Sequence, residues 1–132
     1  ASEASVTQAL VAFERVAPVD AALLGYEAAL ARWPASLTLA VGVGNTLHAA
    51  GRRRDALGHF ERTARRHTSA AAWINAGTIA LELGERRRAR EAAAQAQAIG
   101  GEWSAAAREL QVRIDASSAP PLEETPGRPK FP

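Results

Sequence analysis

Two runs of three arginines are the first residues in this sequence whose type and spacing indicate a binding chemistry. Between Arg52 and Arg90 the chain carries ten arginines against four acidic residues, while the parts before and after each carry a net charge of −2. Such a concentration of positive charge favours an anionic partner. We call the six side chains of the two runs the basic rim: Arg52, Arg53, Arg54, Arg86, Arg87 and Arg88.

The surroundings of the basic rim argue against nucleic acid as that partner. No aromatic residue is interleaved with the arginines to stack on bases, as single-strand binders require. Each run follows a glycine, Gly51 or Gly84, that is expected to end a helix. The arginines would then stand at the start of the next helix, where the helix dipole is mildly unfavourable to cations. We therefore expect a solvated rim, with contact to an acidic protein as the functional alternative.

The residue types that carry catalysis or metal binding form no pattern. There is no cysteine, and the three histidines, His48, His59 and His67, have no carboxylate spacing that would complete a metal site. No nucleophile stands in a recognised motif beside a base, and no glycine loop is suited to a phosphate. The sequence therefore predicts a protein that is not an enzyme and that has no metal and no cofactor.

Composition favours an all-helical fold. Alanine is the commonest residue, β-branched and aromatic residues are sparse, and no apolar run approaches the ~20 residues of a membrane span. The chain begins at Ala1 and contains no methionine, so we expect a piece of a longer protein. Lys130 is the only lysine beside many arginines, which suggests a GC-rich bacterial gene. The composition does not distinguish cytoplasm from periplasm.

A repeat of 33 to 34 residues organises the chain. Gly44 and Gly77 are 33 apart, as are Ala56 and Ala89, and Tyr26 precedes Phe60 by 34. Glycine inside a helix costs about 1 kcal/mol relative to alanine. We therefore expect Gly44 and Gly77 to mark close helix crossings, with Ala56 and Ala89 as the small partners.

This period and its residues resemble the tetratricopeptide repeat (TPR), a 34-residue helix–turn–helix unit. The resemblance rests on Leu47, Ala56 and Phe60 in the second copy and on Trp73 and Ala89 in the third. It implies a right-handed α-α superhelix of about three helical hairpins. A local likeness of "YEAALARWP" and "GVGN" to the C-terminal repeats of bacterial papain-like (double-glycine-type) cysteine peptidases implies, as an alternative, an accessory segment of a larger enzyme.

The expected organisation is a repeat domain at 1–116 and a proline-rich tail at 117–132. The repeats are placed at about 3–35, 37–69 and 70–101. Helices are expected near 5–16, 20–33, 37–50, 53–67, 70–83 and 86–99, with a capping helix at 103–116. Ser36 and Ser69 are predicted N-caps, and Gly51 and Gly84 are predicted to end the first helices.

The TPR resemblance implies a concave groove lined by the first helix of each hairpin. The predicted peptide-binding residues are Val41, Asn45, His48, Ile74, Asn75, Thr78, Leu81 and Arg108, and the first copy would add Thr7, Val11 and Glu14. Asparagine amides can hold a peptide backbone because they both donate and accept hydrogen bonds. A clamp for a terminal carboxylate is excluded, since Thr7, Val11 and Ala71 stand where cations would be needed.

The sequence thus predicts a non-catalytic module that binds a peptide or protein segment of unknown identity. Self-association is the third hypothesis. The tail spaces Pro126, Pro129 and Pro132 in polyproline fashion, so we expect it to lie in the groove of its own or a neighbouring chain.

Overall fold

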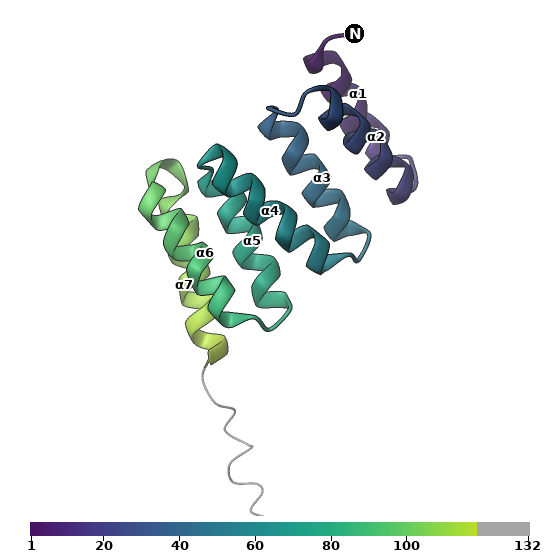
Figure 1. Cartoon of the computed structure of the whole chain (residues 1–132). Coiled ribbons are helices and arrows are strands. Elements are labelled where there is room, and N and C mark those ends of the chain that lie inside the picture. Colours follow the sequence, from purple (N-terminus) through teal and green to yellow (C-terminus); the bar gives the residue numbers. More distant parts are fainter. Residues whose placement is uncertain (119–132) are drawn as a thin grey trace, which may run out of the picture.

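The computed structural model describes residues 1–118, and these form a row of helices without a strand (Figure 1). The tail beyond residue 118 lies outside the described part, as does its predicted place in a groove. Each expected helix is present, with its ends shifted by at most two residues. The helices are α1 (Glu3–Glu14), α2 (Val19–Arg32), α3 (Leu37–Ala49), α4 (Arg53–His67), α5 (Ala70–Glu82), α6 (Arg86–Ile99) and α7 (Ser104–Ser118), the last preceded by a short 3₁₀ turn, η1 (Gly101–Trp103).

Serine side chains begin the first helices of the second and third hairpins, as predicted. The Ser36 hydroxyl accepts a hydrogen bond of 3.1 Å from the backbone N–H of Leu39, and Ser69 accepts one of 3.1 Å from Ala72. Each bond satisfies a backbone donor that the helix itself leaves without a partner, which stabilises a helix by about 1 kcal/mol. Short-range chemistry therefore fixes where α3 and α5 begin.

Glycines end the same two helices in a left-handed conformation. Gly51 has φ of +82°, and the following Arg52 donates its backbone N–H to the carbonyl of Leu47 at 2.9 Å. The same arrangement recurs at Gly84, whose φ is +77°. Only glycine adopts this conformation without steric cost, so the chain turns back at these two points and forms antiparallel hairpins.

Each helix packs chiefly on its neighbours in the sequence, so that α1–α2, α3–α4 and α5–α6 form three stacked hairpins (Figure 1). The helix α7 covers the end of the row and contacts both α5 and α6. Its Ala107, Leu110 and Ile114 are fully buried, as the predicted capping helix requires, while Arg108 and Glu109 between them are exposed. A polar outer helix of this kind closes the hydrophobic core of a solenoid.

The predicted close crossing at Gly44 is present, and the atoms nearest to it belong to Phe60. A Cβ built on Gly44 would lie 2.5 to 2.8 Å from three atoms of the Phe60 ring, and Phe60 is only 1% exposed. The large ring of α4 therefore packs directly on the backbone of α3. Glycine is present because the aromatic side chain, and not a small residue, occupies the space above it.

In the third hairpin, different side chains pack on the backbone of the helix glycine, Gly77. Ala93 stands 33 residues after Phe60, so no aromatic ring covers Gly77. A Cβ on Gly77 would instead lie 2.7 Å from Cδ2 of Leu110 and 3.3 Å from Cβ of Ala92. The capping helix thus supplies the bulk that α6 lacks, and this explains why α7 contacts α5 as well as α6.

Candidate functional site

The predicted groove residues lie on α3 and α5, on the side of the molecule formed by α1, α3 and α5, which we call the first-helix face. Val41, Ile74 and Leu81 are half-buried and pack against the core. Asn45 is exposed, whereas Asn75 and Thr78 are half-buried. Arg108 is exposed on α7, separate from this set. The three apolar side chains are therefore shared between the core and the surface.

Two of the predicted polar residues already have partners within the fold. The Thr78 hydroxyl donates to the carbonyl of Ile74 at 2.9 Å, so it can offer a ligand only its lone pairs. Nε2 of His48 lies 2.7 Å from Oε1 of Glu82, which links α3 to α5. Asn45, in contrast, makes no hydrogen bond to another side chain within residues 1–118, and its amide is available in full.

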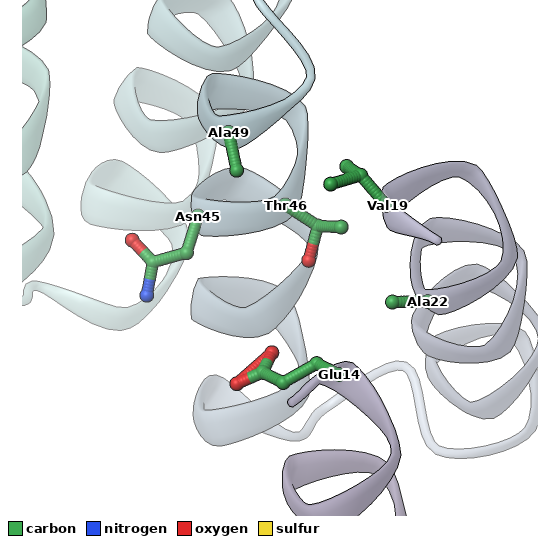
Figure 2. Close-up of a pocket in the computed structure, with 6 residues that line it drawn as sticks. All are labelled: Glu14, Val19, Ala22, Asn45, Thr46 and Ala49. Atoms are coloured by element: carbon green, nitrogen blue, oxygen red, sulfur yellow. The ribbon is translucent and has the colours of Figure 1, made fainter. Parts of the chain in front are cut away.

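A cavity of about 340 Å³ lies beside Asn45, between the first and second hairpins (Figure 2). Figure 2 shows the Glu14 carboxylate and the Asn45 amide on one side of this cavity and the apolar Val19 and Ala22 opposite them. We call it the Glu14 pocket; its lining residues are Glu14, Val19, Ala22, Asn45, Thr46 and Ala49. Its volume suits one side chain of a ligand.

The electrostatics of the Glu14 pocket are set by a single carboxylate. Glu14 is the only charged residue that lines it, and the Thr46 hydroxyl donates to the carbonyl of Gly42 within its own helix. Burial, together with the negative charge and the hydrogen bond of Glu14, raises the pKa of Tyr26 to about 12. The Tyr26 hydroxyl therefore stays protonated beside the Glu14 carboxylate. The pocket offers acceptors to a donor or a cation.

A second and larger hollow, of about 800 Å³, extends along α1 on the same face. It is lined by Ser2, Glu3, Ala4, Thr7, Gln8, Val11 and Thr38. The repeat period indicated Thr7, Val11 and Glu14, because they stand 34 residues before Val41, Asn45 and His48. It missed the other lining residues of both hollows, since periodicity identifies a helix face and not the gap between adjacent hairpins. The missed residues are Val19, Ala22, Thr46 and Ala49 in the Glu14 pocket and Ser2, Glu3, Ala4, Gln8 and Thr38 in the larger hollow.

Four of the six arginines of the basic rim form ion pairs, and five of the six are exposed to solvent, as a solvated rim requires. The pairs are Arg52 with Asp55 (2.8 Å), Arg53 with Glu82 (3.4 Å), Arg54 with Glu85, and Arg88 with Glu61 (2.6 Å) and Glu85 (3.4 Å). Arg54 and Arg88 reach across from one hairpin to the next. The rim arginines thus connect consecutive hairpins, although exposed pairs of this kind each contribute at most about 1 kcal/mol.

Charge is segregated between the two faces of the row. The helices α1, α3 and α5 contain no lysine or arginine, and their charged residues are Glu3, Glu14 and Glu82 beside His48. The helices α4 and α6 together carry nine arginines against three acidic residues. The first-helix face is therefore neutral to acidic, and the side formed by α2, α4 and α6, which we call the second-helix face, is basic.

No protein family matches the chain, and no curated protein matches it either. Several solved structures, in contrast, match the chain. The type III secretion chaperone SycD of Yersinia enterocolitica, in complex with a peptide of the translocator YopD, aligns with a TM-score of 0.76 at 14% identity, covering 90% of this chain and 98% of that one. PcrH from Pseudomonas aeruginosa aligns with a TM-score of 0.76 at 16% identity, covering 89% and 92%. The fold is a TPR-like helical repeat.

MamA, another structure of this kind, aligns with a TM-score of 0.61 at 14% identity and covers 90% of this chain and 80% of that one. At these identities the likeness concerns the fold, so the residues of a site must be argued from this chain itself. Within residues 1–118, no group of three or more histidine, aspartate or glutamate side chains could hold a metal ion. None of the helices in that part is long and apolar enough to cross a membrane.

Proposed function

We propose that this chain is a non-catalytic interaction module that binds a peptide or protein segment along its first-helix face. The observation that carries the proposal is the Glu14 pocket: a cavity for one side chain, with an available amide and a carboxylate, beside helices α1, α3 and α5 that contain no lysine or arginine. The likeness to SycD in complex with a YopD peptide supports it, because a protein of this fold binds a peptide.

The pocket favours a ligand side chain with an apolar stem and a donating or cationic end. Val19 and Ala22 form an apolar wall that would pack against the stem, and Glu14 would accept from the end group. Lysine and arginine have this form. Asn45 would hold the adjacent peptide bond, because its amide both donates and accepts. The larger hollow along α1 would receive the neighbouring residues of the segment.

The strength of the selection can be estimated from the charged contact. A hydrogen bond to a charged group contributes about 1.5 to 3 kcal/mol, and because Glu14 is exposed the lower end applies, which corresponds to roughly a tenfold change in affinity. Replacing Glu14 by glutamine keeps the size and an acceptor oxygen and removes the charge. The variant should therefore lose its preference for a cationic side chain more than its affinity for the peptide as a whole.

A random dodecapeptide display library selected against the full chain tests the proposal. Selected peptides should be enriched in lysine or arginine, and synthetic peptides should bind Glu14→Gln and Asn45→Ala about tenfold more weakly in fluorescence anisotropy. The matched controls are Glu91→Gln and Gln95→Ala, which alter exposed side chains on α6. Peptides that bind all five proteins equally would contradict the proposal. The alternative that the module is part of a larger enzyme such as a cysteine peptidase stays a prediction.

A further inference from the structure

A cavity of about 340 Å³ on the second-helix face is lined by a group of basic side chains that the groove does not use. It lies between the end of α2 and the C-terminal half of α4. One wall carries Leu30 and Pro34, and the wall formed by α4 carries His59, Arg62, Arg66 and His67. We call this cavity the α4 pocket.

The four basic residues converge because of helix geometry. Their positions on α4 differ by three, four and one, so His59, Arg62 and Arg66 follow one face and His67 adjoins it. Nε2 of His59 is 2.6 Å from the carbonyl oxygen of Ala40, to which it donates. Burial is the largest effect on the pKa of His59 and lowers it below its ordinary value. The charge of Arg62 also lowers this pKa, while the hydrogen bond to Ala40 and the charge of Glu27 raise it without reversing the shift. His59 is therefore neutral near pH 7 and fixed in place, and the two arginines supply the charge.

Arg62 and Arg66 are exposed and form no ion pair within residues 1–118. All four acidic residues between Arg52 and Arg90 are occupied by the basic rim. The nearest acidic residue on α2, Glu27, lines an adjoining cavity that shares His59 and Arg62, and not the α4 pocket itself. Part of the unpaired positive charge between Arg52 and Arg90 therefore lies at the α4 pocket, outside the two arginine runs.

The field in the pocket is positive even though it lies near the C-termini of α2 and α4. Each helix end carries about half a negative elementary charge, against two full positive charges on Arg62 and Arg66. The planar guanidinium groups of arginine can each bind an oxyanion through two parallel hydrogen bonds. The lining of the pocket includes no tryptophan, tyrosine or phenylalanine on which a nucleic-acid base could stack.

We propose that the α4 pocket binds an acidic side chain from a segment of a partner protein. The carboxylate would be held by Arg62 and Arg66, and its aliphatic stem would lie against Leu30 and Pro34. The pocket volume is suited to one such side chain with its neighbouring backbone. The site shares no lining residue with the Glu14 pocket, so it goes beyond the proposed peptide groove and does not depend on it.

Isothermal titration of the full chain with acetylated hexaglutamate tests the proposal, with inorganic phosphate and oligothymidylate as parallel probes. The pocket variant is Arg62→Gln/Arg66→Gln. The control is Arg86→Gln/Arg87→Gln, which removes the same charge from exposed arginines on α6 that have no ion pair within residues 1–118. Hexaglutamate should bind the pocket variant at least about tenfold more weakly and the control less than about twofold more weakly. The NMR signals of the His59 and His67 rings should shift on binding.

Three results would overturn the proposal. Equal weakening in both variants would mean that only the overall charge attracts the peptide. Inorganic phosphate that binds as tightly as hexaglutamate would mean a site for a free anion, without a role for the peptide. Oligothymidylate that binds more tightly than hexaglutamate would assign the surface to nucleic acid. If the pocket variant melts early, Arg62→Lys/Arg66→Lys replaces it: this variant keeps the charge but loses the paired hydrogen bonds, and it should bind more weakly than the wild type.

Discussion

Replacing Gly44 by alanine should destabilise the protein, although alanine is the better helix former. The new Cβ would stand 2.5 to 2.8 Å from three ring atoms of Phe60, closer than the 3.0 Å that real Cβ contacts respect. Phe60 is 1% exposed and cannot move into solvent. Overpacking a core costs about 1 to 3 kcal/mol, and a clash with three atoms of a rigid ring belongs near the upper end.

The net effect follows from two opposing contributions. A cost of about 3 kcal/mol for the clash is offset by about 1 kcal/mol of helix propensity, so Gly44→Ala should lose roughly 2 kcal/mol. At about 4 °C per kcal/mol this is a fall in Tm of about 8 °C. Gly58→Ala is the matched control, because its Cβ would meet only Nη1 of the flexible Arg62, at 3.2 Å. It should gain up to about 1 kcal/mol, which separates the two variants by about 3 kcal/mol.

Urea unfolding followed by circular dichroism measures both variants, and a double-mutant cycle identifies the contact. Phe60→Leu shortens the side chain above Gly44 and should relieve the clash, so the two substitutions together should cost at least about 1 kcal/mol less than their sum. A Gly44→Ala variant as stable as Gly58→Ala would refute the packing argument. The functional consequence is local, because Asn45 follows Gly44 and would be displaced with the α3 backbone.

Two further predictions concern side chains that connect neighbouring elements. Tyr26 is the only tyrosine, so its ionisation can be followed by tyrosinate absorbance; the midpoint should lie near pH 12 and should be lower in Glu14→Gln. Since the folded pKa is above the unfolded value of about 10, the stability due to Tyr26 should be complete below pH 10 and should be lost as the pH rises toward 12. Arg88→Ala should lower the free energy of unfolding in urea by about 1 kcal/mol, because it leaves the largely buried Glu61 carboxylate without its partner on the next hairpin. The control Arg87→Ala should change the free energy of unfolding by less than about 0.5 kcal/mol. An equal effect of the two arginine substitutions would show that the Arg88–Glu61 pair does not stabilise the stacking of the third hairpin on the second.

Helix boundaries were predictable because local chemistry decides them. Ser36 and Ser69 cap their helices through bonds to residues three positions ahead, and Gly51 and Gly84 end helices through bonds that span five residues. The capping helix was predictable for a similar reason, since Ala107, Leu110 and Ile114 repeat at helical spacing and become its buried face.

The partners of individual side chains were not predictable in the same way. Gly44 predicted a close helix crossing. Which side chain packs there, that of Phe60, depends on how α4 is rotated against α3. Arg54 pairs with Glu85, 31 positions away, and Arg88 pairs with Glu61, 27 positions away. The runs of arginine predicted a solvated rim, but not its ion pairs, in which Glu85 is shared by Arg54 and Arg88.

The helices, their repeat and the capping of the row could be predicted from the residues alone, because these depend on hydrogen bonds and periodicities within a few turns. The places where a ligand could fit depend on how the helices pack together. The Glu14 pocket arises where α1, α2 and α3 fail to fill the space between them, and the α4 pocket arises in the same way between α2 and α4. Both depend on the angles and offsets at which hairpins stack, and these follow from the packing of all the buried side chains together.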